Sequence, residues 1–237
     1  MKRKKRIGTV GKAIGCLFFL MVSLFPIYWL VAMAIRPTDE MRGHIALIPQ
    51  SLTGIHFAEL FSAKNFGTAI INSLQTTFGS LFVSLVVGIC AAYIIARRRF
   101  RFGLKKPMTY WVLLVRVLPP VAFTIPLYIM FKKIGLYNSP WAIVIIFTVI
   151  QSAFGTYLLS SVYGTFPKSI LEAATIDGAS RWTIFRKIVF PISKPTLSVM
   201  LVFFFIWTWN EYMIPMAFLI DNSTQTIPIA VSSLTGD

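Results

Sequence analysis

Polar and apolar residues are arranged in long blocks along the chain. The apolar blocks cover residues 13–35, 69–96, 107–131, 140–163 and 195–220. Each block has the roughly 20 residues that a helix needs to cross about 30 Å of hydrocarbon. The first block is too long for the apolar core of a signal peptide and lacks a cleavage site of small residues, so we expect a retained helix. The pattern predicts an all-α, polytopic membrane protein with five spans.

The composition agrees with this prediction, and the distribution of charge orients the chain. The chain is 56% hydrophobic with a mean hydropathy of +0.73, which excludes an ordinary soluble domain. Of its 23 basic residues, 17 fall before the first span, between the second and third, or between the fourth and fifth. This bias follows the positive-inside rule and predicts that residues 1–12 form a basic cytoplasmic N-terminus. A nucleic-acid-binding protein would have its Lys and Arg residues clustered on one face of the fold, whereas here they are distributed over three segments. No nucleic acid is therefore expected as a partner.

Reactive and metal-ligating residues are sparse. Cys16 and Cys90 fall in apolar blocks and are expected to be small buried hydrophobes. His44 and His56 fall between the first two spans and are expected on the solvated surface. The sequence holds no His/Cys/Asp/Glu cluster, no nucleotide-binding Gly-rich loop and no nucleophile–base arrangement. An intramembrane enzyme would need such a constellation, so we expect neither a metal site nor an enzyme.

The polar segment between the fourth and fifth blocks carries a helix start, a helix stop and an internal acid. Ser169 and Glu172 have the spacing of a capping box. Gly178 supplies the permissive backbone that commonly ends a helix. Ser180 can cap a second short helix, which Pro191 is expected to stop. The segment is therefore predicted to be a helix–turn–helix outside the hydrocarbon layer.

The order of residues in this segment is similar to a known motif. Glu172-Ala173-Ala174, followed by Gly178, Ile188 and Pro191, resembles the EAA loop of ABC-importer permeases. In that family the loop is the cytoplasmic element that enters a cleft on the ATPase subunit. The resemblance implies that residues 164–194 form a cytoplasmic coupling loop.

Further segments resemble maltose-type carbohydrate permeases, in the same order along the chain. They are Leu24-Phe25-Pro26-Ile27-Tyr28-Trp29 with Arg36-Pro37, Asn72-Ser73-Leu74, Ala91-Ala92-Tyr93, Pro119-Pro120, Ile125-Pro126-Leu127-Tyr128, and Trp209-Asn210-Glu211-Tyr212 with Pro215. The set covers residues 13–237 and resembles in particular the second permease subunit of that importer. It implies the type I ABC-importer transmembrane fold, which usually has six spans. The resemblance implies that residues 221–237 form the outer loop before the sixth span. Because the chain stops there, the sixth span is expected to be missing.

The resemblance also implies a function and a set of partners. The chain would be a permease subunit of an ATP-driven importer for a sugar or oligosaccharide in the cell membrane. A homologous second permease would complete the pathway, and a solute-binding protein would dock outside, near residues 221–237. ATP and magnesium would bind to a dimer of ATPase subunits, and no cofactor is expected on this chain. A permease for a non-sugar solute and a truncated, non-transporting membrane subunit are the alternatives left open.

Five residues of the EAA-like loop are candidates for docking the ATPase, namely Glu172, Ala173, Ala174, Asp177 and Gly178. Glu172 is expected to meet a basic residue of the ATPase, although it could be only a capping acid. The two alanines would let the helix enter a cleft deeply, although helix propensity alone would also favour them. Asp177 precedes the helix stop, where the helix dipole disfavours an acid, and this indicates an external basic partner.

Charged and amide groups within the spans are the candidates for the substrate pathway. A charge at mid-span costs roughly 2.5–3.5 kcal/mol on insertion scales, so it marks a functional residue by default. Arg116 lies near the middle of the third block, and Asn210 and Glu211 lie toward the outer end of the fifth. The depths of Arg116 and Glu211 differ by about 10 Å at 1.5 Å per residue. The two residues could pair across that gap, or each could have only a structural role.

Overall fold

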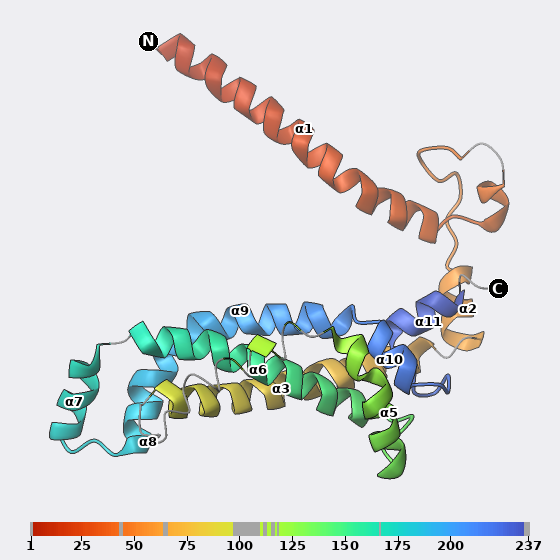
Figure 1. Cartoon of the computed structure of the whole chain (residues 1–237). Helices are drawn as coiled ribbons and strands as arrows, with labels where there is room; N and C mark the ends of the chain where they lie inside the picture. Colours follow the sequence, from red (N-terminus) through yellow and green to blue (C-terminus); the bar gives the residue numbers. More distant parts are fainter. Residues whose placement is uncertain are drawn as a thin grey trace. The chain divides into compact units, whose positions relative to one another are not determined.

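The computed structural model describes residues 2–42, 45–63, 66–96, 110, 113–114, 117, 119–165 and 167–234. These residues form helices and connecting turns, without a strand among them, so the all-α prediction is confirmed for this part of the chain. The chain divides into two compact units, Met1–Lys64 and Asn65–Asp237 (Figure 1).

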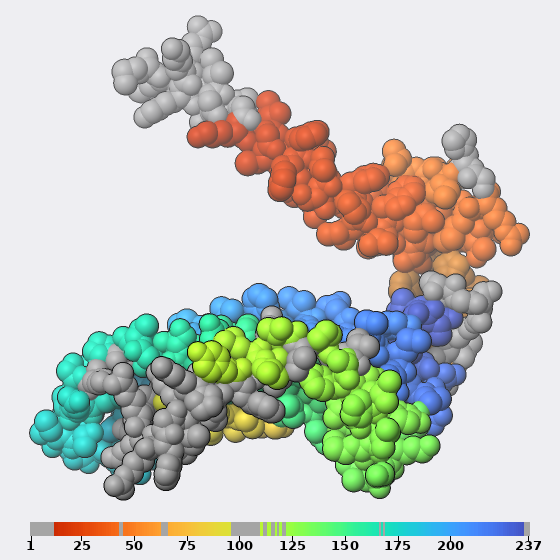
Figure 2. All heavy atoms as spheres, in the orientation of Figure 1, coloured from red at the N-terminus to blue at the C-terminus, as the bar shows by residue number. Residues whose placement is uncertain are grey.

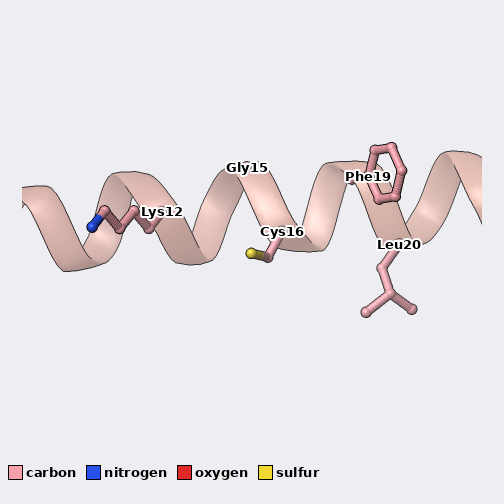
Figure 3. Close-up of a pocket in the computed structure, with 5 residues that line it drawn as sticks. All are labelled: Lys12, Gly15, Cys16, Phe19 and Leu20. Atoms are coloured by element: carbon pink, nitrogen blue, oxygen red, sulfur yellow. The ribbon is translucent and has the colours of Figure 1, made fainter. Parts of the chain in front are cut away.

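The first unit consists of α1 (Lys2–Ala34), the 3-10 turn η1 (Thr38–Met41) and α2 (Ile55–Ala63). Within α1, the stretch Lys12–Ala34 is long and apolar enough to cross a membrane. A hollow of about 540 Å³ lies along one side of α1 and is lined by Lys12, Gly15, Cys16, Phe19 and Leu20 (Figure 3). Because every lining residue comes from this one helix, the hollow is a groove on a helix surface rather than an enclosed site.

Polar side chains hold the segment between α1 and α2. Arg36 is 1% exposed, and its Nη2 donates a hydrogen bond to the Ala46 carbonyl at 2.6 Å. The carboxylate of Glu40 accepts hydrogen bonds from the backbone N–H groups of Gln50 and Ser51 at 3.1 and 2.9 Å. The hydroxyl of Ser51 also donates to Glu40, and this bond is the largest cause that lowers the Glu40 pKa below its ordinary value. We call this segment the clasp, residues 35–56.

Three expectations about cysteine and histidine are wrong. Cys16 and Cys90 are exposed rather than buried. The expectation treated every apolar helix position as core, whereas a helix in a bilayer can keep an apolar face toward equally apolar lipid tails. His56 is half-buried in the clasp, and its Nε2 lies 2.9 Å from the carbonyl oxygen of Arg36. His44 lies outside the described residues.

The second unit contains the remaining helices. They are α3 (Phe66–Ala96), η2 (Pro120–Phe123), α5 (Thr124–Lys133), α6 (Pro140–Thr165), α7 (Lys168–Ile176), α8 (Arg181–Ile184), η3 (Phe185–Val189), α9 (Phe190–Trp209), α10 (Met213–Phe218) and α11 (Ile227–Leu234). With α1, the stretches Phe66–Ile95, Pro140–Thr165 and Arg181–Trp209 make four candidate membrane spans among the described residues. The predicted third span at 107–131 lies largely outside those residues, so the count of five stays a prediction.

Helices α3 and α6 pack closely and run in the same direction. A methyl group added to Gly79 would lie 3.1 Å from the Val144 side chain, and one added to Gly88 would lie 3.5 Å from the Gly155 backbone. The numbers of the contacting residues rise together, which is the signature of parallel helices. Small residues at such positions let two helix backbones approach each other in a membrane. Helices α3 and α6 therefore begin at the same end of the bundle.

Helix α9 packs against this pair in the opposite direction. Gln151 of α6 lies near Phe204 of α9, whereas Tyr163 further along α6 lies 2.7 Å from the Ser193 hydroxyl. The bundle of α3, α6 and α9 therefore has two ends (Figure 1). The hairpin end holds α7 and α8, where α6 ends and α9 begins. The loop end holds α5, α10 and α11, where α3 and α6 begin.

Each half of the bundle has its own buried core. The core toward the loop end consists of Phe131, Ala142, Ile143, Ile146, Phe147, Ile214, Phe218, Leu219 and Ile229. The core toward the hairpin end consists of Leu81, Ala92, Leu159, Leu197, Met200 and Phe204. Both cores use residues from α6 and from the chain after α8, so these segments hold the two ends in one body.

Candidate functional site

The first helix of the predicted hairpin exists, but its start differs from the expected capping box. Helix α7 begins at Lys168, with Pro167 as its N-cap residue and no side-chain capping bond. Ser169 therefore lies inside the first turn and cannot cap the helix, so the capping-box prediction with Glu172 is wrong. Proline fixes φ near −65° and lacks an N–H group, which lets the helix begin directly after it.

The stop of α7 is confirmed at Gly178. This residue has a φ of 76°, in the left-handed region that glycine adopts at little cost. The N–H of Gly178 donates to the Thr175 carbonyl at 3.1 Å, and the N–H of Ala179 donates to the Ala174 carbonyl at 2.9 Å. These two bonds form a Schellman motif, which satisfies carbonyls that the helix end would leave unpaired.

The second helix is capped as predicted, but Pro191 does not stop it. The hydroxyl of Ser180 accepts a hydrogen bond from the N–H of Thr183 at 3.1 Å. Beyond α8 the helix passes through the π turn η3 and continues as α9 to Trp209. A π turn shifts the backbone hydrogen-bonding register by one residue, so the helix accommodates the missing N–H of Pro191 instead of ending there.

The structure brings the five docking candidates together on one short helix and its C-terminal cap. Glu172, Ala173, Asp177 and Gly178 are exposed, and Ala174 is half-buried. These residues lie on α7 or within two residues of its end, so a single partner surface can contact several of them. Figure 2 shows α7 at the tip of the hairpin end of the second unit.

Large apolar side chains are exposed beside the docking candidates. Ile176 is 86% exposed and Trp182 is 67% exposed. The Trp182 ring stacks on Phe185 with centroids 5.6 Å apart, and Phe185 meets the edge of Tyr93 on α3 at 5.4 Å. The aromatic contacts fix the base of the hairpin to the bundle, whereas its tip presents apolar and acidic groups. Exposed apolar groups with a polar rim are typical of an interaction surface.

The pathway candidates that the structure describes make local bonds. The Nδ2 of Asn210 donates to the Ile206 carbonyl at 2.7 Å, where α9 ends. The Oε1 of Glu211 accepts hydrogen bonds from the first two N–H groups of α10 at 3.1 and 3.4 Å. Both residues therefore have a structural role at the junction of α9 and α10. Arg116 lies outside the described residues, so its predicted pairing with Glu211 stays a prediction.

The role of three polar residues that organise the bundle was not predicted from the sequence. Gln151 is fully buried; its Oε1 accepts a hydrogen bond from the Ser84 hydroxyl at 3.0 Å, and its Nε2 donates to the Thr208 hydroxyl at 2.5 Å. This side chain connects α3, α6 and α9. Asn72 and Asn138 bind the loop between α10 and α11. The available signal was an isolated carboxamide within or beside an apolar block, whose partners are distant in sequence.

Among the described residues, no group of three or more His, Cys, Asp or Glu side chains could hold a metal ion. The described residues offer surfaces for contact and groups for hydrogen bonding. The two ends of the bundle carry most of these surfaces and groups. The ends are separated along α3 by the distance from Asn72 to Tyr93, about 30 Å at 1.5 Å per residue.

Comparison with known proteins extends this picture. Residues 84–233 match the family described as binding-protein-dependent transport system inner membrane component. The chain is 26% identical over 214 residues to the trehalose transport system permease protein SugB of Mycobacterium tuberculosis, covering 90% of this chain and 77% of SugB. It is 27% identical over 237 residues to the melibiose/raffinose/stachyose import permease protein MelC of Bacillus subtilis, covering 100% of this chain and 83% of MelC.

A solved structure shares the fold. It is the structure of a bacterial ABC transporter involved in the import of the acidic polysaccharide alginate, and it matches with a TM-score of 0.77 at 24% sequence identity. The match covers 97% of this chain and 80% of the other, so the predicted fold class is confirmed. Because the family match takes in well over half of the chain, this multi-pass membrane protein belongs to the family of binding-protein-dependent transport system inner membrane components.

Proposed function

We propose that the chain is the permease subunit of an ATP-driven importer for a sugar or oligosaccharide. The family description supports the transport role, because it names an inner membrane component of a transport system that depends on a binding protein. The printed names of SugB and MelC support the solute class, because all their named solutes are carbohydrates. The alginate importer, whose cargo is a polysaccharide, shares the fold.

One observation supports this proposal most strongly: two candidate contact surfaces lie at opposite ends of a bundle of membrane length. Asn72 at the loop end binds the backbone of Ser223, and Tyr93 at the hairpin end contacts Phe185. Their separation along α3 is about 30 Å, the thickness of the hydrocarbon core. A subunit that couples an event on one side of a membrane to an event on the other needs this arrangement.

The hairpin end is proposed to face the cytoplasm and to dock an ATPase subunit. Glu172 is exposed on α7 and free to meet a basic side chain, and Ala173 beside it is small enough for close approach. Ile176 and Trp182 add apolar surface that a cleft on the ATPase would cover. Asp177 and Gly178 would lie at the rim of this contact. The basic residues of the neighbouring sequence, including Arg186 on η3, agree with a cytoplasmic location.

The loop end is proposed to face the outside and to receive the solute-binding protein. A homologous permease would pack beside this chain, and the two would enclose the pathway. Two ATPase subunits would bind ATP and magnesium, and their closure would move the hairpins so that the bundle exposes the pathway to alternate sides. The basic N-terminus, residues 1–12, would lie in the cytoplasm.

Asn210 and Glu211 are proposed to line the pathway at the junction of α9 and α10. Asn210 is exposed and Glu211 half-buried, so both side chains remain accessible from outside the bundle despite their local bonds. Carboxamide and carboxylate groups can accept hydrogen bonds from sugar hydroxyls. Arg116 would be their basic counterpart in the predicted third span.

The docking role can be tested by reversing charge at the hairpin and at the loop end. In the assembled importer, Glu172→Arg and Gly178→Asp are expected to reduce co-purification of the ATPase at least tenfold while membrane insertion stays normal. Lys133→Glu, a charge reversal on an exposed residue of α5 at the loop end, is the matched control and should retain the ATPase. Normal co-purification of both hairpin variants would contradict the docking role.

The orientation and the solute class need separate measurements. Cysteines placed at Ile176 should react with a membrane-impermeant maleimide only after the membrane is opened, and labelling of intact cells would place the hairpin outside and refute the proposal. Uptake by vesicles that hold the complete importer should be blocked by an excess of an oligosaccharide. Uptake that only a polyamine or phosphonate can block would assign the permease to another solute class.

A further inference from the structure

We propose that Asn72 and Asn138 are positioning residues that hold the loop of residues 219–226 and helix α11 in one conformation, ready for the solute-binding protein. We call this surface the ledge, residues 219–234. The inference rests on the proposed function, because that function supplies the partner. It adds which side chains give the docking surface its shape.

Asn138, between α5 and α6, is the centre of one set of bonds. Its Oδ1 accepts hydrogen bonds from the N–H groups of Ile220 and Asp221 at 2.9 and 3.2 Å, and from the Thr224 hydroxyl at 2.8 Å. Its Nδ2 donates to the Asp221 carboxylate, and its own N–H donates to the Phe218 carbonyl at 3.1 Å. One side chain and its backbone therefore hold the first half of the loop.

The backbone at Asn138 is itself unusual. Its φ is 59°, and among the described residues it is the one non-glycine position with a positive φ. Asparagine tolerates this region better than other non-glycine residues, but it still costs free energy. The conformation places the backbone and the side chain of Asn138 toward the same loop, so the cost is offset by the bonds that it makes.

Helix α3 holds the second half of the loop from another direction. The Nδ2 of Asn72 donates to the carbonyls of Ser223 and Gln225 at 2.9 and 3.0 Å. The hydroxyl of Ser73 accepts a hydrogen bond from the N–H of Ile227 at 2.8 Å, at the first residue of α11. These bonds cross about 150 positions of sequence, and Asn72 and Ser73 are both buried. They fix where α11 begins.

The surface that results is weakly acidic and mixes polar groups with the exposed apolar side chains of Ile220 and Val231. Asp221, Asn222 and Ser223 are exposed on the loop, and Val231 and Ser233 are exposed on α11. The sequence from 219 to 237 contains no Lys or Arg. Such a surface fits a partner that contributes hydrogen-bond donors and basic groups, since complementary charge favours encounter. Ile229 is buried beneath it in the core of the loop end, which supports the ledge from below.

A loop that is already ordered costs less to bind than one that must be ordered on binding. If the hydrogen bonds of the asparagine side chains are removed, the ledge will adopt other conformations as well. At any moment only a fraction of the protein molecules will then have the ledge in the conformation that binds the partner. Removing either asparagine side chain is therefore expected to weaken binding of the solute-binding protein about tenfold, and removing both is expected to weaken it further.

The test uses the complete importer and its solute-binding protein. Asn138→Gly is the informative variant, because glycine accepts the positive φ while the side-chain bonds are lost. Asn72→Ala removes the second set of bonds without adding volume at a buried position. Hydrogen exchange of the amides of residues 219–227 is expected to accelerate in both variants, and the dissociation constant of the solute-binding protein is expected to rise about tenfold. Lys194→Ala, on an exposed residue of α9 toward the hairpin end, is the control and should change neither measurement.

Three results would overturn the inference. Unchanged hydrogen exchange in Asn138→Gly would mean that the bonds do not hold the loop. Faster exchange with an unchanged dissociation constant would mean that the order of the loop is irrelevant to docking. A lower melting temperature with an unchanged dissociation constant in both variants would assign the asparagines a purely structural role. If the unmodified importer binds no solute-binding protein, the proposed function itself fails, which is distinguishable from these outcomes.

Discussion

The two ends of the bundle are held by different kinds of contact. At the loop end, Asn72 and Asn138 bind a loop that is far from both of them in sequence. Within the hairpin itself, the polar bonds are local, such as the Schellman bonds around Gly178 and the cap that Ser180 provides. At its base, Phe185 makes an aromatic contact with Tyr93 of α3, and the Tyr163 and Ser193 hydroxyls, 2.7 Å apart, join α6 to α9.

This difference suggests what each end is built to do. A hairpin shaped by its own caps keeps its form while it moves as a unit, which suits an element that transmits force. A loop bound by side chains from α3 and from the turn before α6 changes its form when those elements shift. The loop end can therefore respond to the arrangement of α3 and α6, whereas the hairpin end can drive it.

The largest expected effect comes from separating the helices that join the two ends. Gly88→Leu should lower the stability of the protein in detergent by about 1–3 kcal/mol, because the side chain would overlap the Gly155 backbone. Gly88→Ala should be tolerated, since a methyl group there would make an ordinary contact at 3.5 Å. Thermal melting measures both variants.

Gly164, near the end of α6, provides the control for this experiment. A methyl group on Gly164 would meet nothing within 4 Å. Gly164→Leu should therefore melt at the temperature of the unmodified protein or slightly above it, because leucine favours the helix more than glycine does. Equal loss of stability in Gly88→Leu and Gly164→Leu would show that close helix packing is not the cause.

A smaller effect is expected from a substitution in the hairpin, and the change in hydrogen exchange should be confined to the hairpin. Gly178→Val would force a β-branched residue into the left-handed region at a cost of roughly 1–2 kcal/mol. Hydrogen exchange of the Gly178 and Ala179 amides should accelerate, because their two bonds would be lost. Exchange in the ledge should not change if the hairpin is an autonomous element.

The same position offers a conservative replacement. Gly178→Asn should keep the turn, because asparagine is the residue that most often substitutes for glycine at this cap. Faster exchange in the ledge of Gly178→Val, but not of Gly178→Asn, would show that the hairpin shapes the loop end even at rest. That result would show that the two ends of the bundle are not held independently of each other.

The smallest effect concerns the clasp of the first unit, a second loop held by side-chain bonds. The pKa of Glu40 is lowered in the folded protein, so the bonds of Glu40 stabilise the clasp above the unfolded pKa of about 4.3. That stabilisation is lost as the pH falls through the lowered pKa. Protection of the Gln50 and Ser51 amides, corrected for intrinsic exchange, should therefore be constant above the unfolded pKa of about 4.3 and decrease as the pH falls below it.

A variant separates this titration from general acid effects. Glu40→Ala should leave the same two amides weakly protected at every pH. If their protection in the unmodified protein is independent of pH, the carboxylate of Glu40 is not what holds the clasp.

The sequence by itself determined the features that depend on neighbouring residues or on composition. Hydrophobic blocks of span length predicted helices that the structure has as α1, α3 and α6, and the stop at Gly178 and the cap at Ser180 were correct. Short-range signals succeeded because a cap or a turn is satisfied within a few residues. Two short-range predictions failed. Helix α7 begins after Pro167, so Ser169 is not its N-cap residue, and the helix that Ser180 caps continues through a π turn and past Pro191.

Only the tertiary structure decided which polar groups meet across the bundle. Nothing near Gln151 in the sequence indicates Ser84 and Thr208 as its partners, and nothing near Asn72 indicates Ser223. Such pairs depend on the parallel register of α3 and α6 and on the reverse direction of α9. The physical reason is that a buried carboxamide must find a hydrogen-bond partner wherever the packing of the helices brings one. Helix packing brings together residues that are far apart in the sequence, and the pattern of polar and apolar residues along the chain does not indicate which of them will meet.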